Sequence, residues 1–220
     1  MDTIQIPNDT IDHLRYLFDK AYDSLDDAQW IYNKEQLKKL YGIEGMDRVM
    51  QTKRGQPSND VQKIIIDAVK EFDSPGLEKS PHINFARAFY PIAIHVDINE
   101  SLEDGNTIII PLTFNDDIKT LWWKKRVYSP IFDFWVQEQN FFVGKNKVND
   151  LSTRYNLDTG FWPKPEIVDY MEIDGIGDWQ KGTAFMGRRS QPHCSTNFLK
   201  SGITHKDYIL IQTNEPKNHK

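Results

Sequence analysis

The chain has 220 residues, of which 39% are hydrophobic and 27% are charged, with a net charge of −5 and a pI of about 5.7. This composition indicates a folded globular protein, long enough for one large domain or two small ones. The acidic balance does not favour nucleic acid as a partner, since binding to its phosphates requires a basic surface.

The sequence also lacks the features of membrane and secreted proteins. We find no apolar run long enough to span a bilayer and no signal peptide near Met1. The single cysteine, Cys194, rules out an intrachain disulfide and favours a reducing compartment. We therefore expect a cytoplasmic protein without membrane contact.

The first third of the chain is predicted to be helical. Asn8-Asp9 can cap a helix with apolar residues at helical spacing, and Ser24–Tyr41 is expected to continue as one or two short helices. Asn59-Asp60 begins another clear helix, which ends at Ser74-Pro75-Gly76. We expect this N-terminal helical region, residues 1–79, to pack on a sheet.

After residue 80 the pattern changes to β-branched and aromatic runs between turn signals. The candidate strands are Ile83–Asp97, Thr107–Phe114, Lys124–Tyr128, Gly182–Met186 and Asp207–Thr213. Helices followed by many antiparallel strands predict an α+β fold built on a sandwich or barrel. Residues 80–213 form the expected core, and residues 214–220 a polar tail.

The stretch His95-Val96-Asp97 carries the strongest chemical signal. It follows the apolar run Phe89–Ile94, which is typical of a buried strand. Side chains two apart on a strand share a face, so His95 and Asp97 are expected to point to one place. These are two of the three ligands of a 2-His-1-carboxylate facial triad, the Fe(II) site that leaves coordination positions open.

A third ligand is sought among the later histidines, and His193 is favoured over His205. His193 follows Pro192 in a rigid segment, and thirteen residues later Lys206 opens an apolar strand. A cation entering an apolar interior is costly unless it meets an anion, which a bound dicarboxylate would supply. After His205, apart from the adjacent Lys206, no cation follows at a comparable distance before the polar tail.

This pattern resembles the 2-oxoglutarate/Fe(II)-dependent dioxygenases, which have His-x-Asp, a distal His and then a basic residue on the next strand. The stretches Thr107–Leu112 and Pro192–Leu199 also look like uncharacterised oxygenase-like proteins of marine phages. The resemblance covers about residues 80–213 and implies a double-stranded β-helix (jelly roll) with supporting helices. In a phage, the location would be the host cytoplasm. Most of the superfamily has Arg where this chain has Lys206, which lacks Arg's bidentate fork.

The resemblance implies the ligands and the reaction. His95, Asp97 and His193 would bind Fe(II), Lys206 the distal carboxylate of 2-oxoglutarate, and O2 would be the second cosubstrate. A small molecule or a protein side chain would be hydroxylated or oxidatively demethylated.

Other polar residues are candidates for the neighbourhood of the cosubstrate. They are Tyr90, Arg87 and Asn197. Strand parity, counted from position 87 to 95, places Arg87 on the His95 face, so it is the alternative anchor for 2-oxoglutarate.

Simpler interpretations stand beside these. Lys206 can be a strand-edge lysine that deters aggregation, the Arg188-Arg189 pair a solvated turn, and Cys194 a small buried hydrophobe. The tryptophans of the aromatic segment 115–181 are more often core or lid packing than a binding platform: Trp122, Trp123, Trp135, Trp162 and Trp179. Two other functions stay open, a non-catalytic jelly-roll binding or structural protein and a cupin-like metalloenzyme without 2-oxoglutarate.

Overall fold

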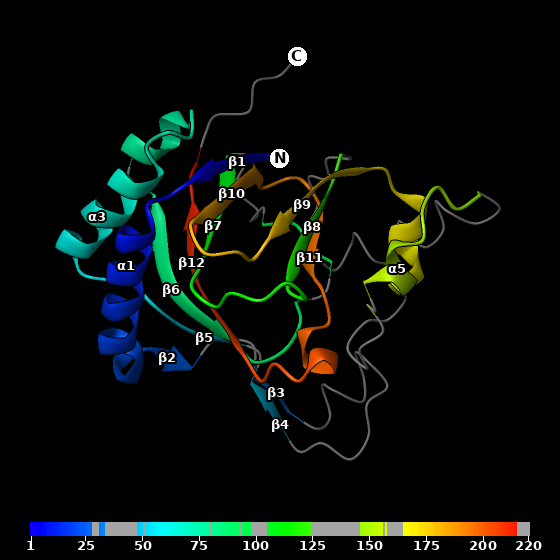
Figure 1. Ribbon diagram of the computed structural model, residues 1–220, viewed down its shortest axis with the longest axis horizontal. Helices are drawn as coiled ribbons and strands as arrows, with labels where there is room; N and C mark the ends of the chain where they lie inside the picture. Colours follow the sequence, from blue (N-terminus) through cyan, green and yellow to red (C-terminus); the bar gives the residue numbers. More distant parts are fainter. Residues whose placement is uncertain are drawn as a thin grey trace.

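The fold consists of two facing antiparallel sheets with two helices against the outer side of the larger sheet (Figure 1). The computed structural model describes residues 1–27, 31–33, 48–50, 52–79, 81–92, 94–97, 105–124, 146–155, 157 and 165–214. Every strand pairing among these residues is antiparallel. This arrangement is jelly-roll-like, as the alternation of strand and turn signals predicted.

The larger sheet has seven described strands. Their order is β1 (Asp2–Gln5), β10 (Thr183–Arg188), β7 (Asn106–Pro111), β12 (Lys206–Gln212), β6 (His82–Ala88), β5 (Thr52–Gly55) and β2 (Asp26–Asp27). The smaller sheet has the order β11 (His193–Ser195), β8 (Lys119–Trp123) and β9 (Ile173–Asp178), and β3 (Ile31–Asn33) pairs with β4 (Arg48–Met50). The strand carrying Lys206 therefore lies inside the larger sheet and not at its edge.

The two predicted helices are confirmed as α1 (Asn8–Ala21) and α3 (Asn59–Val69). Both cover the outer face of the larger sheet (Figure 1), where Leu14, Phe18 and Ile65 are fully buried in one apolar cluster. The other helical segments within the described residues are short: α5 (Leu151–Arg154) and the 3-10 turns η1 (Tyr22–Ser24), η2 (Pro75–Glu78), η3 (Pro165–Tyr170) and η4 (Phe198–Ser201).

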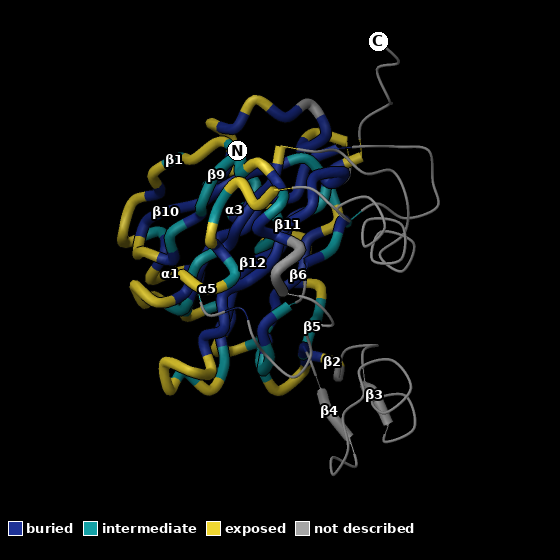
Figure 2. Tube along the Cα trace, turned by 90° about the vertical axis from the view of Figure 1, so that its right-hand side faces the viewer, coloured by how far each residue is buried: buried dark blue, intermediate teal, exposed yellow. Residues whose placement is uncertain are grey.

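A second apolar cluster fills the space between the sheets. There, Trp122 of β8 and Trp179, which follows β9, pack in one cluster with Phe185 of β10 and Phe198 of η4. Figure 2 shows that the buried part of the chain follows the middle of the larger sheet, whereas exposed residues lie on its outer loops. The site described below borders this inner cluster.

Three sequence predictions need correction. The expected strand Ile83–Asp97 ends at Ala88, because a bend at Phe89-Tyr90 turns the chain out of the sheet. Short strands stand where helices were expected over Ser24–Tyr41, as far as that segment is described. The expected strand Lys124–Tyr128 lies mostly outside the described residues, and β8 ends just before it.

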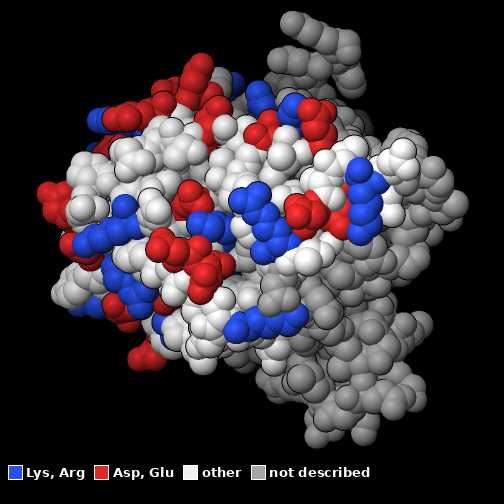
Figure 3. Space-filling model, turned by 45° about the vertical axis from the view of Figure 1, so that its right-hand side comes forward, with Lys and Arg blue, Asp and Glu red and all other residues white. Residues whose placement is uncertain are grey.

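The division at residue 79 stays a prediction. The segment before it supplies the strands β1, β5 and β2 in addition to the helices. No described helix has the length and hydrophobicity needed to cross a bilayer. On the face shown in Figure 3, Lys and Arg side chains are interspersed with Asp and Glu and do not gather in a basic stripe.

Candidate metal centre

The main chain brings the two distant histidines together. His95 and His193 form an antiparallel bridge, in which each backbone N–H donates to the other residue's carbonyl at 3.0 and 2.9 Å. Ser195 N–H donates to the carbonyl of Ile92 at 3.1 Å and extends this contact. The segment after β6 thus runs beside β11, which places the His-x-Asp motif next to His193.

The three side chains converge. One possible ligand atom from each of His95, Asp97 and His193 lies within 4.8 Å of the others. The Nε2 atoms of His95 and His193 lie 3.5 and 3.4 Å from the two carboxylate oxygens of Asp97. Two ligands at right angles, each about 2.1 Å from a metal ion, are separated by about 3 Å. The cluster therefore has nearly the spacing that one first-row metal ion requires.

The orientation of the His193 ring is held by its surroundings. Its Nδ1 lies 3.1 Å from the carbonyl of Gln191, to which it can donate, so that the lone pair of Nε2 faces Asp97. Trp122 stacks on the ring, with centroids 4.2 Å apart and planes inclined by 18°. Gly187 makes room for Trp122, because a Cβ atom at this position would lie 2.3 Å from its Cε3.

The protonation states also suit a metal ion. Burial alone raises the pKa of Asp97, but the two imidazoles and the Thr107 hydroxyl together hold it well below its usual range. Burial, together with His95, lowers the pKa of His193 to about 4. At neutral pH the cluster therefore offers an ionised carboxylate and a neutral imidazole, the forms that ligate metals.

Two residues that the sequence analysis missed hold Asp97 in place. The Thr107 hydroxyl of β7 donates to its carboxylate. The Arg189 guanidinium donates to the Asp97 carbonyl from Nη2 at 2.7 Å and from Nε at 3.1 Å, and it also contacts Asn214. The expectation of a solvated turn is wrong for Arg189, which is only 5% exposed. No signal in the sequence distinguished it from the neighbouring Arg188, which is less deeply buried.

Lys206 lies on the inner face of the larger sheet and is buried. Its Nζ donates to Ser195 Oγ at 2.8 Å and lies 4.3 Å from the centroid of the Trp179 ring. No carboxylate among the described residues lies within ion-pair distance of it. Burial lowers the pKa of Lys206 to about 7. The residue is therefore a buried cation without a protein counterion in the described part of the chain, and its partner Ser195 lies two residues along β11 from His193.

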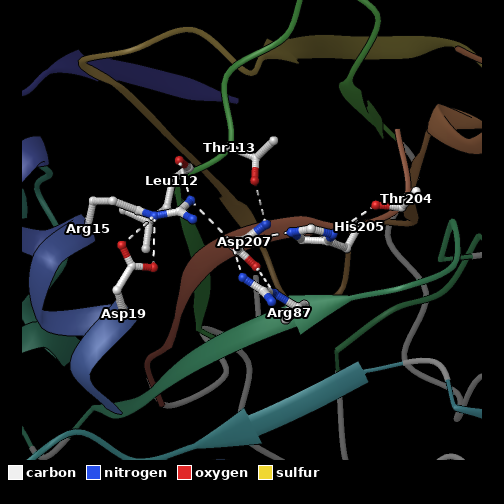
Figure 4. A network of polar contacts seen from close by, with 8 residues as sticks. All are labelled: Arg15, Asp19, Arg87, Leu112, Thr113, Thr204, His205 and Asp207. Carbon is white, nitrogen blue, oxygen red and sulfur yellow. Dashed lines mark hydrogen bonds and ion pairs between the residues drawn. The ribbon is translucent and has the colours of Figure 1, made fainter. Parts of the chain in front are cut away.

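Arg87 does not face this centre, so the parity argument is wrong. The chain leaves β6 after Ala88, and alternation cannot be counted across that bend. Arg87 lies on the helix side of the sheet, where it donates to both carboxylate oxygens of Asp207 at 2.6 and 2.8 Å (Figure 4). Arg15 of α1 also reaches Asp207, at 3.1 Å. Asp207 already neutralises Arg87, which leaves Lys206 as the candidate anchor.

The remaining predicted site residues are less defined. Tyr90 is half-buried in the bend after β6, and Asn197 is buried just before η4. Their roles stay predictions. Cys194 is buried, and burial raises the pKa of its thiol well above the usual value. Trp135 and Trp162 lie outside the described residues.

Comparisons with known proteins agree with a fold of this kind. No family model matches the chain, and no curated protein matches its sequence. The non-heme alpha-ketoglutarate-dependent carbocyclase SnoK from nogalamycin biosynthesis is similar in structure, with a TM-score of 0.50 and 9% identity, over 99% of this chain and 83% of that chain.

Two other solved structures match less well. EvdMO1 has a TM-score of 0.47 and 13% identity over 98% of this chain and 47% of that chain. EvdO2 from Micromonospora carbonacea var. aurantiaca, solved with 2-oxoglutarate, has a TM-score of 0.44 and 11% identity over 98% of this chain and 86% of that chain. The resemblance to phage proteins has no support in these comparisons and stays a prediction. At such identities the likeness concerns the fold, and this chain shares the fold of the carbocyclase.

Proposed function

We propose that this protein is a 2-oxoglutarate- and Fe(II)-dependent dioxygenase built on a double-stranded β-helix. One observation carries the proposal: a His-Asp-His cluster with metal-ligand spacing lies next to a buried cation that has no counterion among the described residues. A triad alone fits many metalloproteins, and a buried lysine alone fits many cores. Together they match a cosubstrate with one end for the metal and one carboxylate for Lys206.

Each residue has a defined task in this proposal. His95, Asp97 and His193 would hold Fe(II), as a facial triad that leaves room for further ligands does. With 2-oxoglutarate and O2 bound, the iron supplies the oxidising chemistry of this class. Lys206 binds the distal carboxylate, and the Ser195 hydroxyl helps to orient its Nζ.

The packing around the cluster serves the same chemistry. Trp122 covers one side of His193 and belongs to the apolar cluster that keeps water from this side of the site. Thr107 and Arg189 keep the carboxylate of Asp97 and its backbone in position. The fold likeness to a carbocyclase of this cosubstrate class supports the proposal.

The decisive experiment needs no knowledge of the substrate. The protein is purified anaerobically, loaded with one equivalent of Fe(II), and tested for succinate formation from 2-oxoglutarate in air. We expect slow uncoupled turnover that requires Fe(II) and is lost in Asp97→Ala. An intact Fe(II) complex that neither binds nor turns over 2-oxoglutarate contradicts the proposal and favours a cupin-like metalloenzyme. No metal binding by the folded protein favours a binding module.

A further inference from the structure

Three aromatic rings lie close to the ammonium group of Lys206. Its Nζ lies 4.3 Å from the centroid of the Trp179 ring, 5.6 Å from that of Tyr208 and 5.7 Å from that of Phe198. The electron-rich face of an aromatic ring attracts a cation within about 6 Å, and the attraction is strongest where water is excluded. All three aromatic side chains are buried, as Lys206 is. The rings therefore stabilise this charge together with the hydroxyl of Ser195.

Trp179 has the nearest of these rings, and its orientation is fixed by other contacts. Its indole Nε1 donates to Thr120 Oγ1 of β8 at 3.0 Å. Its backbone carbonyl accepts from the N–H of Asn115 at 3.0 Å. The Tyr208 ring packs against it, with centroids 5.7 Å apart and planes inclined by 69°. None of these contacts involves the ammonium of Lys206, so the ring is in place whether or not the lysine is charged.

An aromatic ring stabilises this cation in a way that a carboxylate cannot. A carboxylate would neutralise the ammonium, as Asp207 neutralises Arg87 on the other face of the sheet. A ring attracts the charge through its quadrupole and leaves the net charge unpaired. The lysine ammonium is a compact charge with three donors, of which one is directed to Ser195. Lys206 therefore stays able to bind an anion.

We propose that Trp179 is a positioning residue: its ring holds the Lys206 ammonium charged, and directed to Ser195 on the strand of His193, before 2-oxoglutarate binds. The role in cosubstrate binding rests on the proposed function, whereas the contact between ring and ammonium belongs to the free protein. Burial already lowers the pKa of Lys206 to about 7. Loss of the ring should lower this pKa further, because the attraction that favours the charged form would be missing. It should weaken 2-oxoglutarate binding at pH 7 for the same reason.

The test compares two variants that differ in the ring. Trp179→Phe keeps an aromatic face and Trp179→Leu does not, whereas both lose the hydrogen bond to Thr120 and leave cavities of similar size. NMR of protein with isotope-labelled lysine gives the pKa of Lys206, whose signal is the one missing in Lys206→Met. Calorimetry with Zn(II) as an inert substitute for Fe(II) gives the affinity for 2-oxoglutarate at pH 7. Wild-type protein containing fluorinated tryptophan is a third comparison, because fluorine withdraws electron density from the ring and hardly changes its size.

We expect the pKa of Lys206 to be about one pH unit lower in Trp179→Leu than in Trp179→Phe, and 2-oxoglutarate to bind about ten-fold more weakly, with equal Zn(II) affinity in both. Fluorination should lower the pKa of Lys206 in the wild type. The inference is overturned if the two variants have equal pKa values, if the pKa does not respond to fluorination, or if both variants bind 2-oxoglutarate equally well. If Trp179→Leu does not fold, the fluorinated protein decides alone. Absence of 2-oxoglutarate binding by the wild type refutes the proposed function instead, and the pKa comparison then decides the inference.

Discussion

Replacing Lys206 by Met tests two effects of this buried side chain: it lowers the stability of the free protein, and in the proposed function it binds 2-oxoglutarate. Lys206 is 3% exposed and has no carboxylate partner among the described residues, so the free protein keeps this side chain at the expense of stability. Burial lowers its pKa from 10.5 to about 7. At about 1.4 kcal/mol for each pH unit, this corresponds to about 5 kcal/mol against the charged form.

The gain in the free energy of unfolding in Lys206→Met is smaller than this energy. The variant loses the hydrogen bond to Ser195 and the contact with Trp179, and the lysine is half neutral near pH 7. We therefore expect the free energy of unfolding to rise by about 2–4 kcal/mol at pH 7. Because the folded pKa is the lower one, the cost to the wild type is complete below pH 7 and disappears as the pH rises to 10.5. The advantage of the variant should shrink by about 2–3 kcal/mol between pH 7 and pH 9.5.

The same substitution removes the proposed anchor of the cosubstrate. Loss of one partner of a buried charge pair costs about 2–5 kcal/mol, or roughly thirty- to several-thousand-fold in the affinity for 2-oxoglutarate. The metal affinity should not change. Urea unfolding at the two pH values and calorimetry on the Zn(II) protein measure both effects, with the exposed Lys200→Met as control. A variant with unchanged stability and unchanged 2-oxoglutarate affinity would refute the reasoning on both counts.

Three other substitutions test the rest of the site. Asp97→Ala should lower metal affinity at least about a hundred-fold in a metal titration, while circular dichroism shows a folded protein, because its carboxylate serves coordination; unfolding would mark it as structural. Arg87→Ala should destabilise the protein by about 2–4 kcal/mol in urea, since Asp207 loses a buried partner, and leave 2-oxoglutarate affinity unchanged. Gly187→Ala should cost about 1–3 kcal/mol and weaken metal binding, because the new methyl group displaces Trp122; a stable variant with full metal affinity would contradict this packing argument.

The sequence alone determined the features that depend on local order. Helical spacing located α1 and α3, which begin at Asn8 and Asn59 without a side-chain cap, and the motif His95-Val96-Asp97 supplied two neighbouring candidate ligands. The order of motifs selected His193 from among the histidines, and the structure places it beside them. The apolar alternation of β12 placed Lys206 on an inward face, where it is buried.

Only the tertiary structure decided which side of the sheet each cation faces and what it meets there. Parity cannot be counted through the bend after Ala88, so Arg87 was placed on the wrong face. The role of Arg189 could not be predicted either, because a charge in a sequence shows neither its burial nor its partner. A cation's role depends on the desolvation cost of its position and on the carboxylate that reaches it. Strands far apart in the chain supply both, and they meet only after folding.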